Sequence, residues 1–497
     1  MNPIATADYI RILPELVLTA FGIVVMMWDP FLPEGKSRKT LGIVSFIGTL
    51  AAIAAAIYQV NYYGTGWFNM VRVDSFSIFF HILIPAISAI CILASLEYLD
   101  QQKINSGEYY VLILFGTVGM VLMSSAVELV LIFIALEISS ISTYILAGYR
   151  RRVAGATESS IKYFLLGSFA TAFFLYGVAL MFGATNSTSI PKIAESLSGG
   201  NSGLLVYTAT ALMLVGLGFK VAAAPFHVWT PDVYEGAPAP VVALMSTGPK
   251  AAAFAVLLRV LFGTNANGWF VLIWICAALS MTLGNLGALV QNNVKRMLAY
   301  SSIAHAGYLL VAFAAGKEVG LTAAIFYTAA YAAMNVGAFA VVSHFASTGE
   351  KYVSIDDYAG LGRRAPLLAF TLTIFMLSLI GIPLTGGFFA KYYVFRAALQ
   401  ENLIWLTIIG VVNSAVAAYY YLRVMVVMYM REPATEITPE PVSPAMKSAL
   451  VIAAIATIYL GVVPGLVLNY ATKGAQELNT TTVHAAATTT RVPTAPR

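Results

Sequence analysis

Long apolar runs follow one another along almost the whole chain. We count fourteen in the 497 residues, each close to or above the roughly 20 residues that a helix needs to cross a bilayer. Their residues do not alternate between apolar and polar, which excludes the short segments of a membrane β-barrel. The sequence therefore predicts an all-α polytopic membrane protein with about 14 transmembrane helices. The runs are 10–28, 40–62, 75–96, 109–126, 128–148, 159–184, 204–225, 238–262, 269–290, 297–315, 319–345, 366–399, 403–429 and 446–469.

The composition agrees with a chain that lies in a lipid bilayer. Hydrophobic residues make up 59% of the sequence and charged residues only 10%. A soluble domain needs a far more polar surface, so a soluble enzyme and a disordered protein are excluded. The net charge is +5, but the basic residues are scattered and form no long basic run, so no nucleic-acid partner is expected.

Two of the runs contain breaks. The seventh ends at Pro225, and the twelfth, 366–399, is too long for one straight span and contains Gly381, Pro383 and Gly386. Proline removes a backbone donor and interrupts the helical hydrogen-bond ladder. Broken helices at membrane depth are tolerated only inside protein or beside a water-filled cavity. We therefore expect helices 7 and 12 to be broken at an internal site.

The basic residues predict the orientation in the membrane. Loops on one side hold 14 of the 28 Lys and Arg residues, the other side holds 8, and 6 lie within or at the ends of runs. The more basic side is expected to be cytoplasmic, which places both termini on the periplasmic side of a bacterial inner membrane. The tail 474–497, rich in Thr and Ala, is expected to be disordered.

Charged side chains inside the runs are the most informative residues. Each costs about 2.5–3.5 kcal/mol to insert, so an intramembrane charge indicates function. Glu137, Lys220, Lys250 and Lys391 lie in four different runs. One carboxyl and three ammonium groups fit a proton relay and fit a metal site poorly, because lysine is not a usual ligand. The other interpretations are a polar clamp for Glu137 and snorkelling for Lys220.

Other titratable residues leave two interpretations open. Glu158 and Lys162 are four apart and so share a helix face; they either pair at the surface or extend the relay. His305 is either a proton carrier that acts with Ser302 and Tyr308 or a hydrogen-bonded structural residue. His227 borders the break in the seventh run, and His81 is interpreted as a packing residue.

Several stretches resemble subunit N of the proton-translocating NADH-quinone oxidoreductase, respiratory complex I. The most specific is 225–240, which begins Pro-Phe-His-Val-Trp-Thr-Pro-Asp. Lys391 also favours subunit N, because the related subunit M usually carries Glu there. The related subunit L is longer and carries an extra C-terminal helix. The other matching stretches are 71–76, 215–220, 294–308, 381–388 and 419–423.

The resemblance implies a division of the chain. Helices 1–3 (1–108) precede two inverted five-helix repeats, helices 4–8 (109–262) and helices 9–13 (263–430). Helix 14 (431–473) and the tail (474–497) follow. Inverted repeats with broken helices commonly place a site at the bilayer midplane.

The resemblance also implies the roles of the charged residues. In the family, the Glu on helix 5 pairs with the Lys on helix 7, and Lys residues on helices 8 and 12 continue the path, which matches Glu137, Lys220, Lys250 and Lys391. No redox motif is present in the sequence, so no cofactor is expected in this chain. FMN, iron–sulfur clusters and quinone are expected in partner subunits, beside antiporter-like neighbours and small membrane subunits.

The sequence leads to an electrostatic mechanism. A proton from the cytoplasm loads Lys250, with His305 and water as its route. Separation of Glu137 from Lys220 then drives that proton to Lys391 and out. The alternatives are a subunit of a multi-subunit monovalent cation/proton antiporter, a self-contained solute carrier and a structural spacer of the membrane arm.

Overall fold

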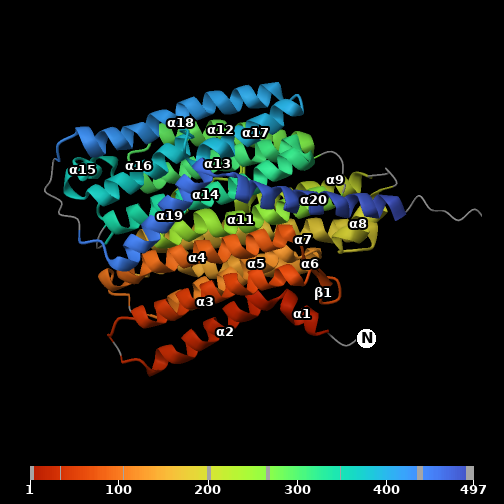
Figure 1. Cartoon of the computed structure of the whole chain (residues 1–497), viewed down its shortest axis with the longest axis horizontal. Coiled ribbons are helices and arrows are strands. Elements are labelled where there is room, and N and C mark those ends of the chain that lie inside the picture. The colour runs from red at the N-terminus through yellow and green to blue at the C-terminus, as the bar shows by residue number, and fades with distance from the viewer. Residues whose placement is uncertain are drawn as a thin grey trace, which may run out of the picture.

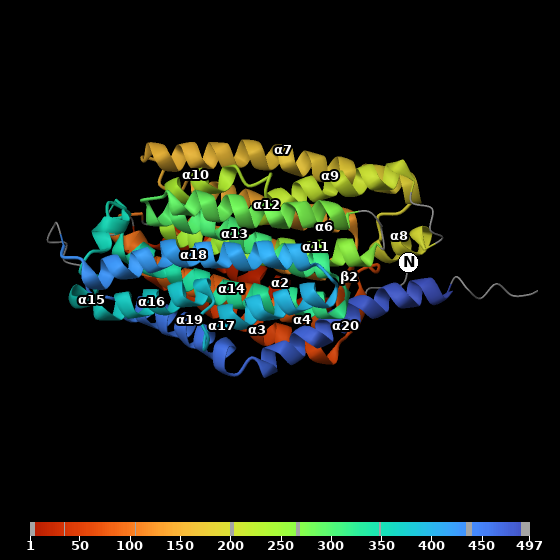
Figure 2. The same cartoon turned by 90° about the horizontal axis from the view of Figure 1, so that it is seen from above.

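The computed structural model describes residues 5–33, 35–104, 106–198, 203–264, 269–346, 349–433 and 440–488. Its long helices run nearly parallel to one another (Figures 1 and 2). The helices and strands are α1 (Thr6–Arg11), α2 (Leu13–Trp28), η1 (Asp29–Phe31), α3 (Lys39–Tyr58), η2 (Gln59–Asn61), β1 (Gly64–Gly66), β2 (Val71–Val73), α4 (Ser75–Gln101), α5 (Glu108–Ser125), α6 (Leu129–Ala147), α7 (Ala154–Thr185), α8 (Ile190–Leu197), α9 (Leu204–Val221), α10 (Trp229–Gly236), α11 (Ala239–Gly263), α12 (Phe270–Leu289), α13 (Val294–Ala315), α14 (Lys317–Phe345), η3 (Ile355–Tyr358), α15 (Leu361–Arg364), α16 (Pro366–Ile380), α17 (Gly386–Gln400), α18 (Ile404–Met430), α19 (Pro444–Val462) and α20 (Gly465–Thr488).

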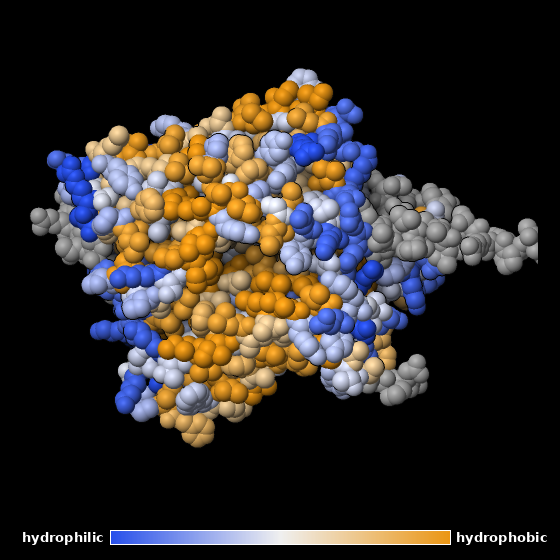
Figure 3. Space-filling view, viewed as in Figure 1, coloured by the Kyte–Doolittle hydropathy of each residue, from blue (hydrophilic) through white to orange (hydrophobic). Residues whose placement is uncertain are grey.

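The described residues contain 13 helices that are long and apolar enough to cross a membrane. The fourteenth predicted span, 366–399, is divided into the half-helices α16 and α17. The predicted polytopic all-α fold is therefore confirmed. Apolar side chains occupy the middle of the surface, and hydrophilic side chains gather toward the two ends of the helices (Figure 3). This distribution is that of a protein surrounded by lipid, where only the helix ends meet water.

Both predicted breaks are present. Helix 7 is divided into α9 and α10, and α9 ends where Ala222 adopts a left-handed conformation with φ 60°. Helix 12 is broken after Ile380, where Gly381 has φ 96°. An L side chain rarely adopts that conformation, so glycine is the residue that ends α16 with least strain.

Three helices form the centre of the bundle. Every residue is buried in an 18-residue membrane-spanning stretch of α11, and 94% of the residues are buried in the corresponding stretches of α13 and α14. By contrast, α2 buries only 28% of its window and lies at one edge, with α18 at the opposite edge (Figure 1). Polar groups on α11, α13 and α14 are therefore shielded from lipid, which is where a bundle tolerates them.

The expectation for the tail 474–497 is wrong for its first part, because α20 continues to Thr488. Ala471, Ala475 and Leu478 form a buried stripe at helical spacing. The Glu477 carboxylate accepts hydrogen bonds from the Ser75 backbone N–H at 2.6 Å and from the Ser75 hydroxyl at 2.8 Å. Small side chains and this contact with α4 hold the helix, although the segment has few large apolar residues. Residues 489–497 lie outside the described residues.

Candidate functional site

The three predicted relay lysines are buried in the bundle. Lys220 is the penultimate residue of α9, Lys250 lies in the middle of α11, and Lys391 lies in α17. Their exposed fractions are 4%, 2% and 6%. Glu137 lies in α6 and is half-buried, and its Oε1 atom is buried without a hydrogen-bond partner among the described residues. These are the residues that a soluble protein would keep at its surface.

Lys220 contacts α6 through a serine. Its ammonium group donates to Ser140 Oγ at 2.8 Å and lies 5.6 Å from the ring centre of Tyr163. The expected ion pair with Glu137 is not formed within 4.0 Å in the described residues, although Glu137 is close enough to act electrostatically on Lys220. Ser140 and Glu137 are three residues apart on one helix face, so Lys220 is held about one helical turn from the carboxyl.

Lys250 follows Pro249 in α11 and reaches α13. Its ammonium group donates to Ser302 Oγ and to the Ser302 carbonyl oxygen, the latter at 3.2 Å. The Tyr331 hydroxyl of α14 donates to the same Ser302 Oγ at 2.7 Å. The central helices thus form a small polar cluster around Lys250 that holds the ammonium group in a fixed position.

His305 lies one turn after Ser302 on α13 and joins a second cluster. Its Nδ1 atom lies 2.7 Å from the Tyr327 hydroxyl, and its Nε2 atom lies 3.3 Å from the Tyr421 hydroxyl. Both Lys250 and Lys391 are close enough to act electrostatically on this imidazole. His305 is therefore within electrostatic reach of both lysines.

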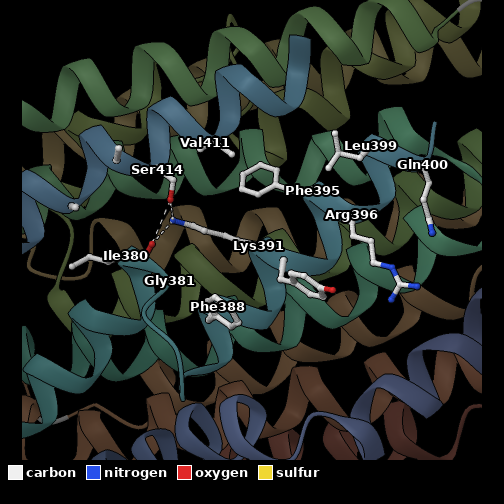
Figure 4. Close-up of a pocket in the computed structure, with 13 residues that line it drawn as sticks. Ile380, Gly381, Phe388, Lys391, Phe395, Arg396, Leu399, Gln400, Val411 and Ser414 are labelled. Atoms are coloured by element: carbon white, nitrogen blue, oxygen red, sulfur yellow. Dashed lines mark hydrogen bonds between the residues drawn. The ribbon is translucent and has the colours of Figure 1, made fainter. Parts of the chain in front are cut away.

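Lys391 extends from α17 to the break in helix 12, where its ammonium group lies. Its ammonium group donates to the Ile380 carbonyl oxygen and to Ser414 Oγ, each at 2.8 Å (Figure 4). It also donates to the Leu379 carbonyl oxygen at 3.1 Å. The last carbonyls of a helix lack intrahelical partners and carry partial negative charge, so the end of α16 receives the ammonium group. A Cβ at Gly381 would meet the Lys391 side chain at 3.1 Å.

A cavity of about 800 Å³ lies beside Lys391. Its walls come from α16, α17 and α18 and are mainly apolar (Figure 4). The ammonium group also lies 4.8 Å from the ring centre of Tyr308. Asn285 donates to the Tyr308 hydroxyl at 3.4 Å and accepts from Tyr420 at 2.9 Å, which places further polar groups near Lys391.

Sequence reasoning named Ser302 and Tyr308 as relay partners of His305 but missed the other hydroxyl groups beside the lysines. Ser140, Ser302 and Ser414 are ordinary residues in an apolar helix, and only the fold shows that each accepts a lysine ammonium group. Tyr234 is also buried and interacts electrostatically with Tyr163 and Tyr331, which lie beside Lys220 and Ser302 respectively. Its hydroxyl has no hydrogen-bond partner among the described residues.

A buried ionic cluster around Glu350 was also missed. The Glu350 carboxylate lies 2.6 Å from Lys295 Nζ and 3.2 Å from Arg150 Nη1. It accepts from the Tyr98 hydroxyl and from the Ala239 backbone N–H, each at 2.7 Å. Burial raises the pKa of this carboxyl, but the charges of Lys295 and Arg150 outweigh burial and hold the pKa below its usual value.

Glu158 and Lys162 lie in a surface cluster rather than in the buried path. Lys162 Nζ is 2.7 Å from Glu158 and 2.9 Å from Asp232. Arg296 bridges Asp232 at 2.8 Å and Glu235 at 2.6 Å. The cluster lines a cavity of about 400 Å³. The pairing of Glu158 with Lys162 is thus present, and an extension of the relay by these two residues stays a prediction.

Replacing Lys162 by glutamine should leave the melting temperature of the assembled complex unchanged, because exposed ion pairs contribute little to stability. The measurement is thermal denaturation of the purified complex at two salt concentrations. A lower rate of proton uptake with an unchanged melting temperature would assign Lys162 to proton entry. A clear fall in the melting temperature would contradict the surface role.

His227 lies in the turn between α9 and α10. Its side chain is half-buried, and its Nδ1 atom has no hydrogen-bond partner among the described residues. The structure does not bring it into contact with the lysines through any hydrogen bond between described groups. No group of three His, Cys, Asp or Glu side chains in the described residues is placed to hold a metal ion.

Fourteen spans with two broken helices and buried lysines define the class of antiporter-like membrane proteins. Residues 126–417, more than half of the chain, match the family described as the transmembrane NADH:quinone oxidoreductase/Mrp antiporter family. The chain is 66% identical to NADH-quinone oxidoreductase subunit N 2 of Koribacter versatilis over 96% of its own length and 98% of that protein.

Solved structures agree with these sequence matches. A chain of respiratory complex I from Thermus thermophilus with bound aureothin is 36% identical, with a TM-score of 0.78, and the match covers 92% of this chain and 98% of that chain. A chain of the Mrp complex from Dietzia, 22% identical over 95% of this chain and 99% of that one, has a TM-score of 0.83 and shares the fold alone.

The chain belongs to the subunit N family of the NADH-quinone oxidoreductases. It is a proton-translocating, multi-pass subunit of this enzyme complex in the inner membrane, where it assembles with other membrane-arm subunits and with lipid. The predicted family is thereby confirmed and preferred over the cation/proton antiporter alternative.

Proposed function

We propose that Glu137, Lys220, Lys250, His305 and Lys391 form the proton path of this subunit. The observation that carries the proposal is the series of buried polar clusters from α6 through α11 and α13 to α17. Each lysine in it donates a hydrogen bond to a serine hydroxyl, a group that is able both to donate and to accept. Such groups, with intervening water, pass protons between titratable side chains.

The first half of the path controls the second through charge. Lys220 is held by Ser140 and lies within electrostatic reach of Glu137. A small shift of α6 against α9 changes the distance between carboxyl and ammonium groups. A change of about 1.4 kcal/mol in that interaction alters proton affinity tenfold. The altered charge at Lys220 then acts on Lys250 by way of the Tyr163, Tyr234 and Ser302 region.

The second half moves the proton outward. Lys250 loses a proton to the hydroxyl cluster of Ser302 and Tyr331. His305, one turn after Ser302 on α13 and in contact with the hydroxyls of Tyr327 and Tyr421, receives it. Lys391, beside the 800 Å³ cavity, is the next acceptor. His305 thus acts between Lys250 and Lys391, whereas the sequence suggested a position before Lys250.

The orientation follows from the charge bias. We infer that the end of the bundle with the Lys162 and Arg296 cluster is cytoplasmic and that both termini are periplasmic. The N-terminus and the far end of α20 lie at the same end of the bundle (Figures 1 and 2), which supports this inference. The electrons that NADH supplies to the complex pass through FMN, iron–sulfur clusters and quinone, all of them in partner subunits.

The inverted repeats 109–262 and 263–430 also belong to this proposal. The broken helix is the fourth span of each repeat, α9 with α10 in the first and α16 with α17 in the second. Lys220 lies before the break in the first repeat, and Lys391 lies after the break in the second.

Replacing Lys220 by methionine should lower the rate of NADH-driven proton pumping at least about tenfold, since loss of the relay charge raises the barrier by more than about 1.4 kcal/mol. The measurement is acidification of inverted membrane vesicles that contain the assembled complex, with NADH oxidation followed in parallel. Replacing Ser140 by alanine should reduce the pumping rate less, because this change removes one hydrogen bond of Lys220 and keeps the lysine charge. Wild-type pumping in the assembled Lys220 variant would refute the relay.

A further inference from the structure

A second group of buried polar side chains lies in the first three spans, outside residues 126–417 that match the family. It consists of Glu15 on α2, Gln59 on η2 and His81 on α4. Glu15 is 6% exposed, and Gln59 and His81 are fully buried. His81 was expected to be a packing residue, but its imidazole is hydrogen-bonded.

The hydrogen bonds of Gln59 fix the tautomer of His81. Gln59 Nε2 donates to the Ile10 carbonyl at 3.1 Å and to the Arg11 carbonyl at 2.8 Å, so both amide hydrogens are used. Its Oε1 atom lies 2.8 Å from His81 Nδ1 and can only accept. His81 Nδ1 therefore carries a hydrogen, and in the neutral imidazole Nε2 presents a lone pair.

That lone pair faces a carboxyl group. His81 Nε2 lies 4.0 Å from Glu15 Oε1. Within the described part of the chain, neither Glu15 oxygen nor His81 Nε2 has a hydrogen-bond partner, and all three atoms are buried. A carboxylate and an imidazole nitrogen are both acceptors, so without a proton they leave three buried acceptors unsatisfied, which is costly. One proton on this pair satisfies two of them at once.

The neighbouring charges are already paired. Asp74, the N-cap of α4, lies 2.8 Å from Arg259 Nη2 of α11 and 3.3 Å from Arg72 Nε. Arg259 acts electrostatically on His81 and is opposed by Asp74. On α5, Ser125 is the polar side chain that influences Glu15, and its hydroxyl donates a hydrogen bond to the Leu122 carbonyl oxygen. None of these described groups replaces the missing proton.

We propose that Glu15 and His81 form a proton-binding site that holds one proton between the Glu15 carboxyl and His81 Nε2. The uncharged arrangement, in which a carboxylic acid donates to the imidazole, avoids the burial of two charges. The ligand is a proton rather than an alkali cation, because only one carboxyl is present and Gln59 Oε1 is occupied. The site is separate from the proton path proposed above and does not depend on it.

Infrared spectroscopy of the purified, assembled complex tests this proposal. The wild-type spectrum at neutral pH should contain a carbonyl band of a protonated carboxylic acid that is absent from the Glu15→Gln spectrum. The matched control is Glu108→Gln, which replaces an exposed carboxyl and should leave the band intact. A wild-type minus Glu15→Gln difference spectrum without this band would overturn the proposal.

A second variant tests the role of His81. In His81→Gln the band should remain but move to higher frequency, because the acid loses its imidazole acceptor. A band at unchanged frequency would overturn the shared proton. If Glu15→Gln fails to assemble, Glu15→Asp retains an acid on a shorter side chain, and the band should then be displaced rather than lost. A spectrum identical to wild type would refute the site.

Discussion

Replacing Lys250 by methionine should reduce NADH-driven proton pumping at least about tenfold, because it removes a relay group from the centre of the bundle and so adds more than about 1.4 kcal/mol to the barrier. Methionine is similar in length and apolar, so α11 keeps its packing. The measurement is the initial rate of proton uptake by inverted vesicles, divided by the rate of NADH oxidation. This effect should be the largest of the single substitutions, since Lys250 lies between Lys220 and Lys391.

The matched control is Lys447→Met, which removes an exposed ammonium group at the start of α19. It should pump at the wild-type rate. The two variants change net charge equally, so a difference between them reports the position of the lysine and not the overall charge. Equal pumping by the two variants, with equal amounts of assembled complex, would refute the role of Lys250.

The main features of the fold could be predicted because membrane insertion imposes a simple rule on the sequence. Apolar runs of sufficient length form spans, and Pro225 and Gly381 interrupt two of them. The helix of residues 465–488 could not be predicted in the same way. It is held by small side chains such as Ala471 and by the contact of Glu477 with α4, and neither produces an apolar run.

The candidate site could be predicted only in part for a related reason. Lys220, Lys250 and Lys391 stand out because charge is rare in an apolar run. Their hydroxyl partners do not stand out, since serine and tyrosine are common in membrane helices and the contacts join residues far apart in sequence. The expected direct pair of Glu137 with Lys220 came from resemblance, and the geometry places Ser140 at the ammonium group instead.

Glu350, a residue with a role in stability, also could not be identified from the sequence. It lies after α14 in a segment with no sequence signal, yet its carboxylate joins Tyr98 of α4, Arg150 before α7, the start of α11 and Lys295 of α13. Its side chain is only 5% exposed. One carboxylate thus connects elements from both halves of the chain at one end of the bundle.

Replacing Glu350 by glutamine should lower the free energy of unfolding by about 3–5 kcal/mol, because it leaves the buried charges of Lys295 and Arg150 without a counter-charge. The measurement is denaturant titration in detergent micelles, with the amount of assembled complex as a second readout. The control is Glu432→Gln, which removes an exposed carboxyl and should change little. Equal stability of the two variants would contradict the role of Glu350.

The pH dependence of this difference follows from the sign of the pKa shift. Lys295 and Arg150 hold the pKa of Glu350 below its usual value in the folded protein, against the effect of burial. The stabilisation is then fully present above the unfolded carboxyl pKa of about 4.3 and is lost as the pH falls through the lower folded pKa. Wild type and Glu350→Gln should therefore differ most near neutral pH and converge below about pH 4. A difference that grows on acidification would show that the carboxyl is not held ionised by its two partners.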